Sequence, residues 1–192
     1  MVKTRFDSLS DPELVELCNS GGREDATAAF GLLYRRHRDY VMRVALRFSS
    51  DREIAADTLQ ETFIYLLQKF PPSGDGLVLT ARLRSLLYPV AKNLTITALK
   101  RRRREERPAG FDPDRLPDSR TLDPPREDLA RIVEGLSAAH REVLLLRFVD
   151  GMRLKEIAEA LEIPPGTVKS RLHFAVLRLR EKLGGQYEFP LD

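Results

Sequence analysis

The sequence predicts an all-α protein with two small helical domains joined by a flexible linker. Apolar residues recur at helical spacing through most of the 192 residues, and convincing two-residue alternation, which would indicate strands, is hard to find. Residues 106–126 interrupt this pattern, because they are rich in Pro, Asp and Arg and have no apolar period. We therefore expect one domain over residues 1–105, a linker over 106–126 and a second domain over 127–186.

Composition excludes several classes of protein. Hydrophobic residues make up 42% of the chain, enough for real cores, and no apolar run approaches the ~18 residues of a membrane span. The N-terminus lacks the apolar segment of a signal peptide. Cys18 is the only cysteine, which excludes an internal disulfide framework and a cysteine-based zinc site. We expect a cytoplasmic protein without a metal or cofactor and without membrane insertion.

Four helices are expected in the first domain, over residues 12–19, 23–49, 52–70 and 80–104. Asp11 is the expected N-cap of the first, since Pro12 suits the first helical position. Pro89 lies inside the fourth and removes one backbone hydrogen bond, so we expect a kink near residues 85–89.

The third of these helices has two different faces. Its core face carries Leu59, Phe63, Leu66, Leu67 and Phe70. Another face carries Asp57, Gln60, Glu61 and Gln68, with Ile64 among them. An acidic, amide-bearing face with an aliphatic centre suits docking onto a basic partner, although spacing alone favours an ordinary solvated face.

The fourth helix ends in a basic run. The chain has 32 Lys and Arg against 29 Asp and Glu, and a net charge of +3 is too small to indicate nucleic acid unless the charge is concentrated. Here it is concentrated, in Lys92, Lys100, Arg101, Arg102, Arg103 and Arg104, with Asn93 beside them. Basic residues on successive turns can follow phosphates, and Tyr88 could stack on bases. The alternatives are a solvated helix end for the arginines and a core position for Tyr88.

The C-terminal domain carries the sharpest pattern. Helices are expected over 127–135 and 137–149, and then a short helix and a longer one are separated by the turn EIPPG. Two apolar stripes face each other across this turn: Leu154, Ile157, Ala158 and Leu161, then Val168, Leu172, Ala175, Val176, Leu179 and Leu183. Off the stripe, near the start of the last helix, lie Thr167, Lys169, Ser170, Arg171, His173, Phe174 and Arg178. This arrangement predicts a helix-turn-helix whose second helix enters the major groove of DNA, with a plain helical hairpin as the alternative.

These segments together resemble the extracytoplasmic-function (ECF) family of bacterial sigma factors. AADTLQETFIYLL is similar to the family's helix that binds core RNA polymerase, which implies that role for Asp57, Gln60, Glu61 and Ile64. SLLYPVAKNLTITALKRRRRE is similar to its −10 melting helix, and GTVKSRL lies in the match to its −35 domain. In the −10 match three positions depart from the family's pattern: Leu86 replaces a frequent Trp, Pro89 a frequent Arg and Thr97 a frequent acidic residue. In the −35 match, Phe174 and Val176 replace frequent arginines.

The resemblance implies a monomeric promoter-specificity subunit with core RNA polymerase, promoter DNA and an anti-sigma factor as partners. It also implies that the loop over residues 71–80 captures an unpaired −10 base. No Ser/His/Asp set, Cys/His pair or phosphate-binding glycine loop is present in the sequence, so we expect binding rather than catalysis. Two alternatives remain: an autonomous helix-turn-helix regulator, and a sigma-like adaptor that does not melt promoters.

Overall fold

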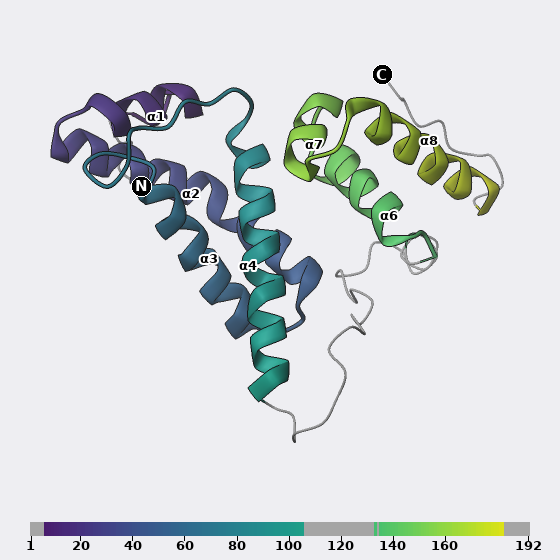
Figure 1. The fold of residues 1–192 in the computed structure, drawn as a ribbon. Coiled ribbons are helices and arrows are strands. Elements are labelled where there is room, and N and C mark those ends of the chain that lie inside the picture. The colour runs from purple at the N-terminus through teal and green to yellow at the C-terminus, as the bar shows by residue number, and fades with distance from the viewer. Residues whose placement is uncertain (1–5, 106–132, 134, 183–192) are drawn as a thin grey trace. The chain divides into compact units, whose positions relative to one another are not determined.

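The computed structural model describes residues 6–105, 133 and 135–182, and no strand occurs among them. The chain divides into two compact units, Met1–Arg115 and Leu116–Asp192, which are described separately (Figure 1). The division falls within residues 106–126, which lie outside the described part, so the linker and the domain bounds stay predictions. None of the described helices is both long and apolar enough to span a membrane.

Four helices make up the described part of unit 1, residues 6–105. They are α1 (Asp11–Ser20), α2 (Arg23–Phe48), α3 (Arg52–Leu67) and α4 (Leu83–Glu105). The longest, α2, packs against each of the other three, and α3 also packs against α4. The predicted helices are all present, and Pro89 lies inside α4 as expected, while the kink there stays a prediction.

Aromatic contacts close the core where α3 ends. Phe30 of α2 meets Phe63 and Phe70 edge to face, with ring centroids 6.3 and 6.2 Å apart. Phe70 lies beyond the last residue of α3, because the chain turns there and brings its ring back onto α2. The predicted core position of Leu67 is wrong: the side chain is 52% exposed, because it lies one turn after exposed Ile64 on the outer side of α3, whereas the packed side carries Thr58, Thr62 and Leu66.

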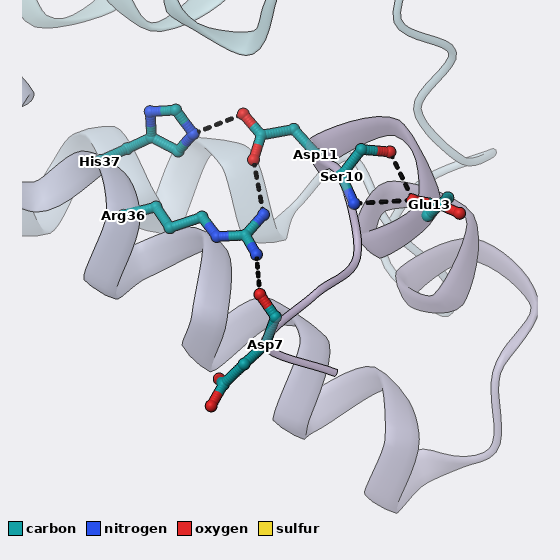
Figure 2. Close-up of polar contacts among 6 residues, drawn as sticks. All are labelled: Asp7, Ser10, Asp11, Glu13, Arg36 and His37. Atoms are coloured by element: carbon teal, nitrogen blue, oxygen red, sulfur yellow. Dashed lines mark hydrogen bonds and ion pairs between the residues drawn. The ribbon is translucent and has the colours of Figure 1, made fainter. Parts of the chain in front are cut away.

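The start of α1 differs from expectation in a useful way. Ser10, not Asp11, is the N-cap, and both its backbone N–H and its hydroxyl donate to Glu13 Oε2, at 2.7 and 2.6 Å. The Glu13 carboxylate accepts both hydrogen bonds from Ser10. Because Ser10 is the N-cap, the Asp11 side chain is available for other partners (Figure 2).

The Asp11 carboxylate ties α1 to α2. Its Oδ2 lies 2.7 Å from Nε2 of buried His37, and its Oδ1 accepts a hydrogen bond from Arg36 Nη1 at 3.2 Å (Figure 2). The hydrogen bond from His37 is the largest cause that lowers the pKa of Asp11; burial opposes it, and the charge of His37 and the Arg36 guanidinium reinforce it. The ionised carboxylate is therefore part of the folded structure.

A second carboxylate ties α3 to α4. Asp51 is the N-cap of α3, where its Oδ1 accepts hydrogen bonds from the Glu53 and Ile54 N–H groups at 2.8 and 3.4 Å. Its Oδ2 forms an ion pair with Arg102 of α4. The Asp51 side chain thus bonds to free N–H groups at the start of α3 and also holds the basic end of α4.

Unit 2 is built around its last helix. Its elements are α6 (Ala138–Leu144), the π-helical turn η1 (Leu145–Val149), α7 (Leu154–Leu161) and α8 (Pro165–Lys182). Both α6 and α7 pack on α8, and Leu136, Leu144, Ala175 and Leu179 form a buried cluster. The helix predicted over 137–149 is present, but its last turn is a π turn that the spacing did not indicate. The helix predicted over 127–135 lies almost wholly outside the described residues.

Replacing Asp11 should destabilise unit 1. We expect Asp11→Ala to lower the free energy of unfolding by about 1–3 kcal/mol at pH 7, because it leaves a buried imidazole and a guanidinium without their shared acceptor. Urea unfolding monitored by circular dichroism measures this. Since the pKa of Asp11 is lowered by folding, its contribution is present above the unfolded value of about 4 and is lost as the pH falls below it.

The matched control is Asp39→Ala. Asp39 is exposed and 3.5 Å from Arg38, so its removal should change stability by no more than about 0.5 kcal/mol. Equal effects of the two substitutions, or an Asp11→Ala effect that persists undiminished at pH 3, would contradict the assignment.

Candidate functional site

The outer side of α3 carries a compact group of exposed residues. Asp57, Gln60 and Glu61 are exposed as the sequence predicts, and the aliphatic Ile64 is 53% exposed. Leu67, which sequence analysis assigned to the core, adds a second exposed aliphatic side chain one turn further along. We call Asp57, Gln60, Glu61, Ile64 and Leu67 the α3 surface.

The α3 surface has the anatomy of a protein interface. Two neighbouring aliphatic side chains, each more than half exposed, lie beside carboxylates and an amide. An apolar centre with a polar rim is typical of interfaces, and a purely solvated helix face does not need the apolar centre. The exposure of Leu67 therefore favours docking over the solvated alternative.

The basic residues of α4 separate into two groups by contact. Arg102 pairs with Asp51, so it belongs to the fold. The other predicted residues are Lys92, Asn93, Lys100, Arg101, Arg103 and Arg104, which we call the α4 surface. Lys92 and Arg103 are half-buried and the other four are exposed. Arg101 also pairs with Glu105 at 2.9 Å, on the surface.

Helical geometry aligns three of the four exposed members of the α4 surface. At 100° per residue, Asn93, Lys100 and Arg104 fall within about 20° of one line along the helix. The line is about 16 Å long at 1.5 Å per residue. A row of exposed donors and positive charges of this length matches a run of several phosphates.

Tyr88 does not join that row. Its side chain is 1% exposed, one of the largest fully buried side chains of unit 1. The prediction that Tyr88 contacts DNA is therefore corrected: the ring is closed to bases in this structure, and the core position that the sequence also allowed is the one observed.

An open pocket lies where the α3–α4 connection joins α4. It has a volume of about 510 Å³. Its lining comes from α1, α2, the connection and the start of α4, namely Asp11, Pro12, His37, Leu79, Ala81, Arg82, Leu83 and Arg84. No local sequence pattern indicates this pocket, because its lining residues are distant in the chain. Its lining includes charges of both signs, the Asp11 carboxylate and the guanidinium groups of Arg82 and Arg84.

The predicted helix-turn-helix is confirmed in unit 2. Ile157 and Ala158 of α7 are buried, as are all the described residues of the predicted α8 stripe; Leu183 lies outside the described part. The turn begins at Glu162, which has left-handed backbone angles of φ 54° and ψ 41°. The Ile163 N–H then donates to Ala158 O at 3.0 Å, which closes the end of α7.

The first turns of α8 expose most of the residues predicted to contact DNA. Lys169, Ser170, His173, Phe174 and Arg178 are exposed, and Thr167 and Arg171 are half-buried. We call these seven residues the α8 surface. Phe174 is 56% exposed, with the rings of His173 and His140 at centroid distances of 5.9 and 6.2 Å. The surface thus offers cations, hydroxyls and one apolar ring on a rigid helix.

Cys18 is a buried residue of α1. Cys18 is 6% exposed and burial raises the pKa of its thiol to about 11, which fits a packing residue. Within the described part of the chain, no three or more His, Cys, Asp or Glu side chains are grouped so that they could hold a metal ion.

Comparisons with known proteins agree with this geometry. Family models described as Sigma-70 region 2 and Sigma-70, region 4 match residues 33–105 and 126–179. The ECF RNA polymerase sigma factor SigL of Mycobacterium tuberculosis is 35% identical over 167 residues, which cover 84% of this chain and 92% of SigL.

Two solved structures share the fold at lower identity. CnrH, in complex with the cytosolic domain of CnrY, has a TM-score of 0.60 and 22% identity, covering 92% of this chain and 99% of CnrH. The sigma factor RpoE from Bartonella quintana, in complex with the anti-sigma factor NepR, has a TM-score of 0.59 and 22% identity, covering 82% of this chain and 98% of RpoE.

The turn of the helix-turn-helix makes a stability prediction. Glu162 is a non-glycine residue with positive φ, so we expect Glu162→Gly to raise the free energy of unfolding of unit 2 by about 0.5–1 kcal/mol. The control is Glu159→Gly, in the middle of α7, which should lower it by about 1 kcal/mol. Thermal unfolding of the two variants should shift the transition of unit 2 in opposite directions; shifts of the same sign would contradict the assigned turn conformation.

Proposed function

Since the chain belongs to the extracytoplasmic-function (ECF) family of RNA polymerase sigma factors, we propose that it brings core RNA polymerase to specific promoters by binding both partners, with no catalysis of its own. The observation that supports this mechanism best is the separation of three exposed surfaces, on α3, α4 and α8, each with a different composition. Such a protein works in the cytoplasm, where core polymerase is found.

In this proposal the α3 surface binds core polymerase. Ile64 and Leu67 lose their exposed apolar area in the complex, and each such side chain is worth on the order of 1–2 kcal/mol when fully buried. Asp57 and Glu61 then select a basic partner surface and repel an acidic one. The apolar contacts that give affinity and the charges that select the partner thus come from adjacent turns of α3.

The α8 surface recognises the −35 element. Recognition helices place their N-terminal residues on base edges in the major groove, and α8 exposes Lys169 and Ser170 there. Arg171 can donate to guanine, and the exposed ring of Phe174 can contact a thymine methyl group. The −35 element would therefore be recognised as duplex, by a preformed and rigid surface.

The α4 surface and the pocket act on the −10 element. Asn93, Lys100 and Arg104 follow phosphates, so this part of the binding depends strongly on salt. The pocket of about 510 Å³ at the α3–α4 connection has room for one unpaired base. Unstacking costs a few kcal/mol per step, and contacts of polymerase and of this unit supply that energy without ATP.

The two units reach both promoter elements because of the chain between them. About 20 residues span at most roughly 70 Å when extended, comparable to two turns of B-DNA at ~34–36 Å each. Binding of one element then raises the effective concentration of the other unit at its own element. A monomer suffices for this arrangement.

An anti-sigma factor is the third proposed partner. The support is that the similar sigma factor RpoE was solved in complex with the anti-sigma factor NepR. A partner that covers the α3 surface would prevent binding of core polymerase.

Reversing the charge of the α3 surface tests the proposed function. Asp57→Arg with Glu61→Arg should abolish core binding and run-off transcription from a pool of random linear promoters, because two favourable charges become repulsive. Circular dichroism should be unchanged, since both side chains are exposed. The control, Glu16→Arg with Asp39→Arg on α1 and α2, should transcribe like the wild type. A wild-type chain that never binds core polymerase would refute the function, and normal binding by the first variant would refute this surface.

Truncating Arg171 tests −35 recognition. If its guanidinium binds a guanine by two hydrogen bonds, Arg171→Ala should cost about 1–3 kcal/mol on the preferred −35 sequence and less on others. Binding of duplexes that differ at single −35 positions measures this. A loss that is the same for every duplex would identify Arg171 as a phosphate contact instead.

A further inference from the structure

Asn19, near the end of α1, holds the α3–α4 connection by its main chain. Its Nδ2 donates to Leu77 O at 2.9 Å, and its Oδ1 accepts from the Leu77 N–H at 2.9 Å. The side chain thus satisfies both backbone groups of one residue, 58 positions away in the sequence. Figure 1 shows the connection crossing α1 on its way from α3 to α4.

The backbone of the connection is adapted to this contact. Gly76 has a φ of +98°, a conformation that side-chain-bearing residues rarely adopt. A Cβ placed there would lie 3.1 Å from Asn19 Oδ1, tighter than ordinary van der Waals contact. Glycine is therefore required beside Asn19 for two reasons, one conformational and one steric.

Asn19 holds the α3–α4 connection at Leu77, directly after the turn that follows α3. Before it, the chain folds back on the end of α3, with the Gly74 N–H donating to Phe70 O at 2.9 Å and the Gly76 N–H to Lys69 O at 3.0 Å. Among the described residues, the next backbone hydrogen bond after Leu77 is at the start of α4, where the Ser85 N–H donates to Arg82 O at 2.9 Å. Asn19 is thus the last fixed point before the residues that line the pocket.

The residues after Leu77 alternate between two environments. Val78 is 83% exposed and Thr80 is exposed, whereas Leu77 and Leu79 are half-buried and Leu79 lines the pocket. In an extended segment successive side chains point to opposite sides, so fixing Leu77 also fixes which residues face outward. If the chain shifted by one residue at Leu77, the outward-facing and inward-facing side chains of this segment would exchange places.

We propose that Asn19 is a positioning residue for selection of the −10 sequence. By holding Leu77, it presents Val78 and Thr80 to the unpaired strand and keeps Leu79 at the pocket. This inference rests on the proposed function, because it assigns a role within −10 recognition. Asn19 itself acts through Leu77 and is not proposed to touch DNA.

The test uses the full chain with core polymerase and a promoter pool randomised across both the −10 and −35 elements. Sequencing of the transcribed templates gives base preferences for the wild type, Asn19→Ala and Gly76→Ala. The matched control is Ser20→Ala, whose hydroxyl bonds only within α1, to Glu16. Hydrogen exchange of the Leu77 amide reports directly whether the connection has been released.

With the two hydrogen bonds lost, we expect the −10 preference of Asn19→Ala to fall by about tenfold and the Leu77 amide to exchange faster. The −35 preference and the affinity for core polymerase should stay within about twofold of the wild type, because the Asn19 side chain bonds to Leu77, which belongs to neither the α3 surface nor the α8 surface. Gly76→Ala should reproduce this pattern with Asn19 intact, which keeps the test valid if Asn19→Ala does not fold. Ser20→Ala should match the wild type.

Two results would overturn the inference while leaving the proposed function in place. One is an unchanged −10 preference in Asn19→Ala although the Leu77 amide exchanges faster. The other is a parallel loss of −10 preference, −35 preference and core affinity, which would make Asn19 merely structural. By contrast, a wild-type chain that enriches no −10 sequence from the pool would refute the proposed function itself, and the inference with it.

Discussion

Unit 1 depends on the burial of α2 between α1, α3 and α4. Leu33, Val41, Val44 and Ala45 line this helix and are buried, and the rings of Phe30 and Tyr34 extend the same contact to the end of α3. Burial of apolar surface on this scale is the dominant stabilising term in a small helical domain. Because α3 and α4 each commit one face to it, their opposite faces are rigidly presented, and those faces carry the charges and amides assigned to partners.

Polar contacts then set how the helices meet at their ends, where apolar packing is weakest. Asp11 joins α1 to α2, and Asp51 joins the start of α3 to Arg102 of α4. A hydroxyl pair, Thr58 with Thr95 at 3.2 Å, lies buried between α3 and α4 and satisfies groups that would otherwise be costly in a core. The orientation of the α4 surface relative to the α3 surface is therefore specified by a few directional contacts, which non-directional packing alone would not achieve.

Much of the architecture could be predicted from helical periodicity, and the failures have local physical causes. The turn between α7 and α8 and the exposure of Ile64 follow from spacing and turn chemistry. Leu67 was assigned wrongly because the packed face of α3 includes the buried hydroxyls of Thr58 and Thr62, which an apolar period does not show. Asp11 was assigned wrongly because Ser10 and Glu13 cap α1 together. The Asn19–Leu77 contact was beyond sequence reasoning, since no local pattern links an asparagine to a main-chain position 58 residues away. The three residues of α4 that depart from the family's −10 pattern differ in exposure. Leu86 and Pro89 are half-buried, whereas Thr97 is exposed beside the α4 surface.

The burial of Cys18 has a consequence for how such a protein can receive signals. With a pKa of about 11, roughly one thiol in ten thousand is ionised at neutral pH, and oxidants attack the ionised form. As the chain has no other cysteine, a thiol-based redox signal acting directly on it would have to act on this shielded side chain. Such a signal would first have to separate α1 from α2, because Cys18 Sγ lies at their contact, 3.7 Å from Ala26 O.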